Sequence, residues 1–351
     1  MRRLLVFSLG VLLAFDATGQ GRKKKNKKDV EPVTQTLPLL PDPPSAISAD
    51  TSRLVFHVSP LSAKGLLSQQ VRDALKALQS DSHGATIVKL RAFVSGTGDL
   101  RRVQSILSEV FTERKLPLPA LSTVQVGALP MEGAQVVIES VAMDKKSVNM
   151  SGLAFFSGLA AKSAGQAIER LKGSVAAAGV KPGSVLRVTC FLSSLDDVQS
   201  ARSSIAAAFP AAATDYVQPQ RLALEPMAAC EAVGRPELPV DRAIEISSEA
   251  ALINTPKIVF TGTQMAFGDQ DNDLHLAFDR LKKALESVNA RYQDVFWSSA
   301  YPLTRPVEGK AEKVGADFMA QEHSPAGTRL LFEGLPSLDA TYALEVMAGI
   351  N

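Results

Sequence analysis

The sequence has few of the residues that build metal centres and disulfide scaffolds. Its 351 residues include two cysteines, Cys190 and Cys230, and four histidines, which occur without HxxxH or HxH spacing. Two cysteines exclude a disulfide-dense scaffold and a zinc site made of cysteines alone. Segment 269–273 has alternating aspartates but lacks the closing glutamate of a calcium loop. We therefore expect no bound metal and no cofactor.

Signatures of nucleotide binding and of serine hydrolases are also missing, since the chain has no GxGxxG, P-loop or GxSxG motif. Basic and acidic residues nearly balance at 38 and 36, but eight of the basic ones lie within residues 1–28. The rest of the chain is therefore net acidic. Because non-specific nucleic-acid affinity comes from neutralising phosphates, we expect the folded body to bind no nucleic acid.

The apolar run at the N-terminus is too short to cross a bilayer, which needs roughly 20 residues. This run, 4–15, follows Arg2 and Arg3 and precedes small residues at 17–19, and no cysteine follows it. That arrangement is typical of a secretory signal rather than a lipoprotein anchor. We predict a signal peptide over residues 1–19 and a secreted or periplasmic location.

Residues 20–50 are predicted to be a disordered linker. A basic run at 22–28 is followed by five prolines between 32 and 44. Like charges repel one another, and proline-rich segments are stiff and extended. The basic run has the composition that contacts anionic surfaces. Folded structure is expected to begin near Thr51.

The remaining chain repeats one order of signals three times. In the middle copy, 148–158 alternates as strands, 164–179 has helical periodicity, and 185–192 is a β-branched strand. A second helix at 195–209 and strands within 216–233 complete it. The corresponding helices are predicted at 68–78 and 100–113 in the first copy and at 274–289 and 310–321 in the third.

These signals predict an α+β protein with three units, at 51–146, 147–240 and 241–351. Each unit contains strands for one mixed sheet and two amphipathic helices. Because the helices have one apolar face each, we expect both to cover the same face of their sheet.

The units resemble the RidA/YjgF/L-PSP family, whose fold is chorismate-mutase-like. The resemblance lies in Ser-Gly or Thr-Gly openings, in a central strand and helix, and in closing strands that end in a glutamate motif. These segments are 155–161 and 259–268, 183–205, 119–130 with 137–142, and 325–336 with 343–348. The first unit diverges most, because its opening at 57–65 lacks the Ser-Gly pair.

Single-unit members of this family are homotrimers with a central barrel of sheets, outer helices and ligand clefts between neighbours. The resemblance therefore implies an intramolecular pseudo-trimer, in which covalent linkage replaces bimolecular assembly. We expect a monomeric chain with three clefts that need not be equivalent.

Deaminases of this family hydrolyse the imine of a 2-imino acid. An arginine forks onto the substrate carboxylate, and a glutamate on the last strand positions the attacking water. The arginine position is occupied here by Leu121, Thr214 and Gly327. Because a carboxylate without that fork is neither neutralised nor oriented, the resemblance disfavours standard imine hydrolysis.

The glutamate is present in all three units, as Glu139, Glu231 and Glu345. The resemblance makes these residues candidates for positioning water. The alternative is that each is a charged residue at a strand end, bonded within the protein.

Four further residues are candidates for ligand binding. Arg329 lies two residues beyond Gly327 and by strand alternation should share the face of the missing arginine, unless it is an exposed cross-strand partner. Ser157 and Thr261, in the Ser-Gly and Thr-Gly turns, could donate to a carboxylate or be plain turn residues. Arg202 matches a ligand-facing helix position of the family, with solvated helix surface as the alternative.

The functional expectation is an exported pseudo-trimer that binds a small metabolite, such as one bearing a carboxylate, without standard imine deaminase activity. The alternative is a residual enamine/imine (2-iminoalkanoate) deaminase, a hydrolase acting on C=N bonds, using Glu345 with Arg329 as carboxylate anchor. Because the missing arginine is what disfavours hydrolysis, we expect that replacing it would help, and that Gly327→Arg would restore activity better than Leu121→Arg. Cys190 is expected to be a buried free thiol.

Overall fold

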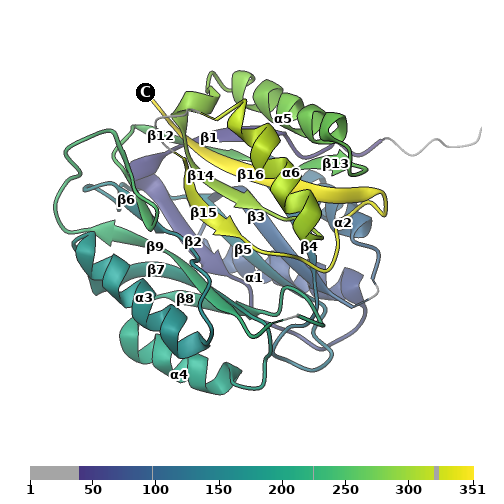
Figure 1. The fold of residues 1–351 in the computed structure, drawn as a ribbon, viewed down its shortest axis with the longest axis horizontal. Coiled ribbons are helices and arrows are strands. Elements are labelled where there is room, and N and C mark those ends of the chain that lie inside the picture. Colours follow the sequence, from purple (N-terminus) through teal and green to yellow (C-terminus); the bar gives the residue numbers. More distant parts are fainter. Residues whose placement is uncertain (1–38, 97, 224, 320–323) are drawn as a thin grey trace, which may run out of the picture. The chain divides into compact units, whose positions relative to one another are not determined.

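Three β-sheets and six helices make up the described part of the chain in this computed structural model (Figure 1). The structure describes residues 39–351 except 97, 224 and 320–323, and Leu40–Asn351 form one unit. The predicted signal peptide, the basic run and most of the predicted linker lie outside the described residues. None of the described helices is long and apolar enough to cross a membrane.

The first sheet has the strand order β2-β5-β3-β4, in which β3 and β4 are parallel and the other pairs antiparallel. Two helices pack against one face through apolar side chains such as Val71 and Leu75 of α1 and Ile106 of α2. Their three- and four-residue spacing gives each helix one apolar face. The elements are α1 Leu67–Asp81, α2 Arg101–Glu113, β2 Leu54–Val58, β3 Thr86–Ser95, β4 Ala120–Val126 and β5 Val136–Met143.

The second sheet has the order β10-β11-β6-β9-β7-β8, again with one parallel pair, β7 and β8. Helices α3 and α4 cover one face, and Leu171 and Ile205 contribute to their apolar cluster (Figure 1). The elements are α3 Ala164–Ala177, α4 Val198–Ala208, β6 Leu153–Phe156, β7 Val180–Leu192, β8 Ala213–Val217, β9 Ala228–Pro236, β10 Ile244–Ile246 and β11 Ala250–Ile253.

The third sheet has the order β1-β12-β16-β14-β15, with β13 also paired to β16 and with β14 and β15 parallel. Helices α5 and α6 cover one face through residues that include Leu281 and Val307. The elements are α5 Asp271–Glu286, α6 Arg305–Ala316, β1 Ala46–Asp50, β12 Lys257–Thr261, β13 Gln264–Phe267, β14 Val295–Ala300, β15 Ala326–Arg329 and β16 Ala340–Ile350, with short 3-10 turns at Thr51–Arg53 and Tyr292–Asp294.

The predicted α+β class is confirmed, and the main errors concern helix starts. Helix α6 begins at Arg305 rather than near residue 310, because Thr304 precedes it and a proline occupies its first turn. Proline suits that position, since its missing N–H has no helical partner there. Helix α5 begins at Asp271, where Gln270 and Asp273 form a capping box.

The linker predicted to reach residue 50 ends earlier, because Ala46–Asp50 forms β1. This strand pairs with β12 of the third sheet, while the next strand along the chain, β2, belongs to the first sheet. Similarly, β11 pairs with β6 of the second sheet, and the following β12 belongs to the third. The strands β1 and β11 thus each pair with a different sheet from that of the strand that follows them in the chain. These backbone hydrogen bonds tie the sheets together.

Two apolar clusters lie on the side of the sheets away from the helices, and each draws on all three sheets. One contains Phe56, Phe155 and Phe296. The other contains Phe93 and Phe191 of the first two sheets and Phe332, from the segment that follows β15. Aromatic rings meet directly between sheets, with the Phe93 and Phe191 centroids 5.8 Å apart. The sheets therefore share an interior core.

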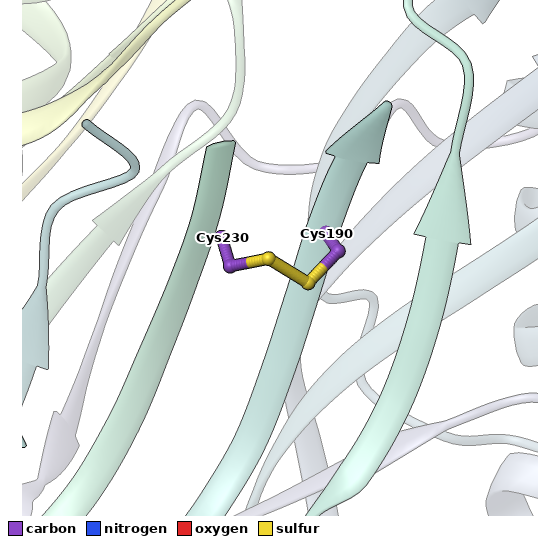
Figure 2. Close-up of a disulfide and its surroundings, with 2 residues drawn as sticks. All are labelled: Cys190 and Cys230. Atoms are coloured by element: carbon purple, nitrogen blue, oxygen red, sulfur yellow. A yellow bond between two sulfur atoms is a disulfide. The ribbon is translucent and has the colours of Figure 1, made fainter. Parts of the chain in front are cut away.

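A disulfide joins Cys190 of β7 to Cys230 of β9 (Figure 2). The prediction that Cys190 is a free thiol is therefore wrong. The two cysteines face each other in register across the antiparallel pair, and both belong to the apolar cluster beneath α3 and α4. Because 40 residues separate them in sequence, only the strand register reveals the pairing.

The edge position of β1 gives a direct test of its contribution to stability. Ala49→Glu would bury an unpaired charge in the interior cluster, since Ala49 is 3% exposed. We expect it to lower the free energy of unfolding by about 3 kcal/mol or more. Ser48→Glu is the matched control, because Ser48 is exposed on the same strand, and it should change stability by less than about 0.5 kcal/mol. Urea denaturation measures both, and equal effects would contradict the observed pairing.

Candidate functional site

The three glutamates that the sequence singles out lie in one buried ion cluster. Each is 5% exposed or less, and their partners are Lys89, Arg91 and Arg187, at 6% exposure each. We call these six residues the inter-sheet ion cluster: Lys89, Arg91, Arg187, Glu139, Glu231 and Glu345. Its three cations match its three anions, so the cluster is neutral as a whole.

Glu139 has two arginine partners. Arg91, directly opposite it on β3, donates from Nε at 2.7 Å and from Nη2 at 3.0 Å to its two carboxylate oxygens. Arg187 of the second sheet lies 3.3 Å from the same carboxylate, and the hydroxyl of Thr189 donates to it. This fork-on-fork geometry leaves the carboxylate oxygens engaged within the protein.

Glu345 is held by the first sheet. Lys89 forms an ion pair with it and also donates to Ser122 Oγ at 2.6 Å and to the Thr261 carbonyl at 2.6 Å. Ser122 and Tyr301 donate to the same carboxylate, Tyr301 at 2.5 Å. An ammonium ion with three protons has three acceptors here, so its hydrogen bonding is complete.

Glu231 receives its cation from an unusual place. Each sheet has one position that pairs with the residue two beyond its glutamate. This position holds Lys89 in the first sheet, Arg187 in the second and Trp297 in the third. The third sheet therefore has an indole where the other two have a cation. Arg91 compensates by donating Nη2 to Glu231 as well as to Glu139, and so joins the first and second sheets.

Electrostatics favour the ionised forms of Glu139 and Glu345. Burial opposes ionisation of Glu139, but Arg187 and Arg91 outweigh it and lower the pKa of Glu139 from 4.5 to about 2. Burial likewise opposes ionisation of Glu345, whose pKa Lys89 and Arg91 nevertheless lower. A carboxylate held this strongly by cations is a poor general base, because it has little affinity for a proton.

The cations were missed in the sequence analysis. Lys89, Arg91 and Arg187 stand inside strands whose neighbours are mainly apolar. A charge in such a strand, in phase with other inward positions, is a signal for a buried partner of opposite sign. Which glutamate each cation would meet depends on contacts between sheets.

The predicted ligand residues are not gathered in one place. Ser157 Oγ accepts a hydrogen bond from the Gly327 amide at 3.0 Å, and Thr328 Oγ1 accepts one from the Gly158 amide at 3.0 Å, which joins the second and third sheets. Thr261 is fully buried, and its hydroxyl bonds to the backbone of Val346. The Thr261 hydroxyl thus both donates and accepts within the protein, whereas Ser157 uses only its acceptor oxygen in the contact with Gly327.

Arg329 and Glu345 are not brought together. Arg329 forms a 2.9 Å ion pair with Glu312 of α6, on the helix side of the third sheet. Glu345 pairs in register with Ser299, whereas Arg329 pairs with the next residue, Ala300, which belongs to the cluster under the helices. Alternation therefore places the two side chains on opposite faces.

Arg329 instead lines an open cleft of about 850 Å³ between segments of the second and third sheets. The cationic lining residues are Lys162, Arg170, Arg305 and Arg329, with Glu225 as the acidic one. Arg202 lines a different cleft, of about 350 Å³, where its guanidinium lies 5.5 Å from the centre of the Tyr216 ring. Among the described residues no group of His, Cys, Asp and Glu side chains could hold a metal ion.

Comparison with known proteins identifies the fold family. Residues 46–144 match the family model described as Endoribonuclease L-PSP. The chain contains a domain of the RidA/L-PSP family. The match falls on the segment whose opening motif diverges most, so the family pattern in this unit rests on residues other than the Ser-Gly pair. A search of curated proteins gives no match.

Solved structures of the family align at low identity. A YjgF/YER057c/UK114 family protein from Mycobacterium tuberculosis is 18% identical, with 26% of this chain and 79% of that chain covered and a TM-score of 0.25. RidA from a Psychrobacter species is 15% identical, over 26% and 80%, with a TM-score of 0.25. A Neisseria meningitidis YjgF-family protein is 12% identical, over 29% and 84%, with a TM-score of 0.26. These values identify no activity for the present chain.

Strand register supports the alignment with the RidA arginine position. In each sheet, the residue at this position pairs with the residue just before the one that pairs with the glutamate. The three pairs are Leu121 with Leu90, Thr214 with Val188, and Gly327 with Ser298. The three residues therefore occupy one position, and none is cationic. A Cβ at Gly327 would lie 1.8 Å from the Ser298 carbonyl oxygen. This argues against the expectation that Gly327→Arg would restore activity better than Leu121→Arg, because the strand has no room for a side chain there.

The glycines of the RidA-like turns have a structural reason. A Cβ at Gly158 would lie 2.7 Å from Thr328 Oγ1, and one at Gly262 would lie 2.9 Å from the Leu121 carbonyl oxygen. In both cases the turn of one sheet approaches the strand of another sheet that contains the arginine position. Glycine is needed because any side chain would push the sheets apart.

Glu139→Gln separates a structural contribution from a catalytic one. The substitution leaves Arg91 and Arg187 buried with one carboxylate fewer, so we expect a loss of about 3–5 kcal/mol in the free energy of unfolding at neutral pH. The folded-state pKa of about 2 lies below the usual 4.5, so stabilisation by Glu139 is present above that value and is lost as the pH falls toward 2. The difference in the free energy of unfolding between the parent and Glu139→Gln should therefore become smaller as the pH falls toward 2.

Urea unfolding as a function of pH measures both effects. Glu113→Gln is the control, because this carboxylate is exposed at the end of α2. It should change stability by less than about 0.5 kcal/mol. A similarly small effect for Glu139→Gln would mean that the buried ion pairs do not support the fold.

Proposed function

We propose that residues 51–351 form three RidA-like units, at 51–146, 147–240 and 241–351, arranged as an intramolecular pseudo-trimer, with β1 as an added edge strand. Each sheet has one parallel pair and two helices on one face, which supports the repeat. The shared interior clusters and the inter-sheet ion cluster support assembly within one chain.

We further propose that the protein binds small metabolites in clefts between units and does not hydrolyse imines in the RidA manner. The observation that carries this proposal is the state of the three glutamates. Each is held by at least one buried cation of the protein, while the arginine position holds Leu121, Thr214 and Gly327. Water would thus lack both an available base and an oriented electrophile.

The deaminase alternative, with Glu345 as base and Arg329 as anchor, has less support. The two side chains lie on opposite faces of the third sheet, and each has an ionic partner of its own, Lys89 and Glu312. The endoribonuclease named in the family model is also disfavoured for this chain, because the body beyond the basic run is net acidic.

Export remains part of the proposal. The disulfide between Cys190 and Cys230 supports it, since disulfides form and persist in oxidising compartments such as the periplasm and the extracellular space. The predicted signal peptide at 1–19 is consistent with that compartment.

The catalytic proposal is tested with freshly generated 2-iminopropanoate. We expect ammonia release at the uncatalysed rate, because no guanidinium neutralises the substrate carboxylate. Acceleration by the unmodified protein that disappears in Arg329→Ala but persists in Arg101→Ala would favour the deaminase alternative. Arg101 is the matched control, since it begins α2 and is exposed.

The pseudo-trimer predicts that the purified chain is a monomer. The protein used should retain residues 39–50, because β1 belongs to the third sheet. Light scattering should give a mass near 37.3 kDa for the full chain. A trimer of chains would mean that the sheets close between molecules instead of within one.

A further inference from the structure

The cleft of about 350 Å³ that Arg202 lines is formed between segments of the first and second sheets. The first-sheet wall is mostly apolar and includes Val58, Leu61 and Val137, whereas the second-sheet wall contributes Arg202, Thr214, Asp215 and Tyr216. Two of these residues, Arg202 and Asp215, are charged groups outside the inter-sheet ion cluster.

Asp215 is a buried carboxyl group without a partner. It is 5% exposed, and neither of its oxygens accepts a hydrogen bond from any described residue. Thr189 faces it from β7, but the single hydroxyl proton of Thr189 is donated to Glu139. Buried polar atoms are usually satisfied, so an unsatisfied carboxyl group that lines a cleft points to a missing ligand.

The corresponding position in the other two sheets carries a hydroxyl group. Ser122 pairs with Arg91, Asp215 with Thr189, and Thr328 with Ser299, all at the same register. Ser122 and Thr328 each make a hydrogen bond to a neighbouring sheet. Asp215 therefore differs from its counterparts in the other two sheets. It adds hydrogen-bond acceptors directly after Thr214, the position at which the RidA pattern has an arginine.

Charge balance decides which ligand Asp215 suits. The inter-sheet ion cluster is already neutral, so an ionised Asp215 would add a negative charge without compensation. Burial, followed by the nearby Glu139, raises the pKa of Asp215 well above its usual value, although Arg187 and Arg91 act in the opposite direction. Burial therefore favours the neutral form of Asp215, whereas a cation in the cleft would favour its ionised form.

We propose that this cleft binds a ligand with an apolar body and a cationic amidinium or ammonium head that donates hydrogen bonds to Asp215. The inference rests on the proposed function of inter-unit binding and names the ligand class of one cleft. On binding, the Asp215 proton leaves to solvent, and the ligand cation replaces it as the partner of the carboxylate. The apolar side chains of the first-sheet wall would contact the ligand body.

A carboxylate ligand held by Arg202 is the competing possibility. Arg202 is exposed, and its guanidinium lies over the Tyr216 ring. Exposed charges are screened by water and salt, whereas Asp215 is buried and presents only a carboxyl group. An anion in the cleft would therefore keep Asp215 protonated and gain little from Arg202.

Benzamidine and benzoate test the proposal, because they have the same shape and opposite charge. We expect saturable binding of benzamidine to the full chain in calorimetric titration near pH 7. We expect at least tenfold weaker binding of benzoate. Asp215→Ser, which restores the hydroxyl group of the other sheets, should weaken benzamidine at least tenfold, as expected on loss of a charge-assisted hydrogen bond.

Proton release gives a readout that a merely structural residue would not affect. The charged groups near Asp215 are Glu139 of β5, Arg91 of β3 and Arg187 of β7. Tyr216 of β8 and Arg202 of α4 line the same cleft. Titrations in buffers of different ionisation enthalpy should show about one proton released per benzamidine bound. This release should be absent in Asp215→Ser.

Two controls keep the outcome decisive. Asp215→Ser should melt at the parental temperature or above it, because it removes an unsatisfied buried carboxyl group, so lost binding cannot be ascribed to unfolding. Arg202→Ala should bind benzamidine equally or more tightly, since it removes a like charge.

Three results would overturn the proposal: no saturable benzamidine binding, binding that Asp215→Ser leaves unchanged, or tighter binding of benzoate that Arg202→Ala abolishes. The third result would retain inter-unit binding as the function while assigning the cleft to carboxylates. Imine hydrolysis, measured separately, tests the proposed function without reference to this cleft.

Discussion

The inter-sheet ion cluster is the constraint on which the rest of the structure depends. Removing an ion from water costs several kcal/mol, so three buried carboxylates are tolerable only beside an equal number of cations in good geometry. Lys89 reaches from the first sheet to the third, and Arg91 and Arg187 join the first and second. Because these three ion pairs each span two sheets, displacing one sheet would leave charges unpaired, and the mutual placement of the sheets is fixed by charge as well as by apolar contact.

The same pairing limits the chemistry that the glutamates can perform. A general base must accept a proton during the reaction, but Arg187 and Arg91 outweigh the effect of burial and lower the pKa of Glu139 to about 2. The third sheet illustrates the need for a cation beside each glutamate. Trp297 stands where the other sheets carry a cation, and Arg91 serves Glu231 in its place. A glutamate at the corresponding position of each of the three sheets is thus accounted for by charge balance.

Local sequence was sufficient for elements whose signals are local. The period of 164–179 and the β-branched run at 185–192 predicted α3 and most of β7 correctly. Long-range pairing was not predictable: β1 looked like the end of a proline-rich linker, because its partner β12 is about 200 residues away. Likewise, Cys190 and Cys230 gave no pairing signal until register placed them face to face. The glutamates were found by their repeat, but the cations that hold them lie on other strands and at unequal positions.

Three linked units can diverge in ways that a homotrimer cannot. In a homotrimer, a substitution such as serine to aspartate at the position of Ser122 and Thr328 would place three unpaired carboxyl groups around one interior. In the proposed single-chain arrangement it occurs once, as Asp215, and its cost is limited to one unsatisfied buried carboxyl group. The loss of a cation at Trp297 follows the same logic, since Arg91 can replace one missing charge but not three. In the proposed arrangement, covalent linkage therefore allows each cleft its own charge.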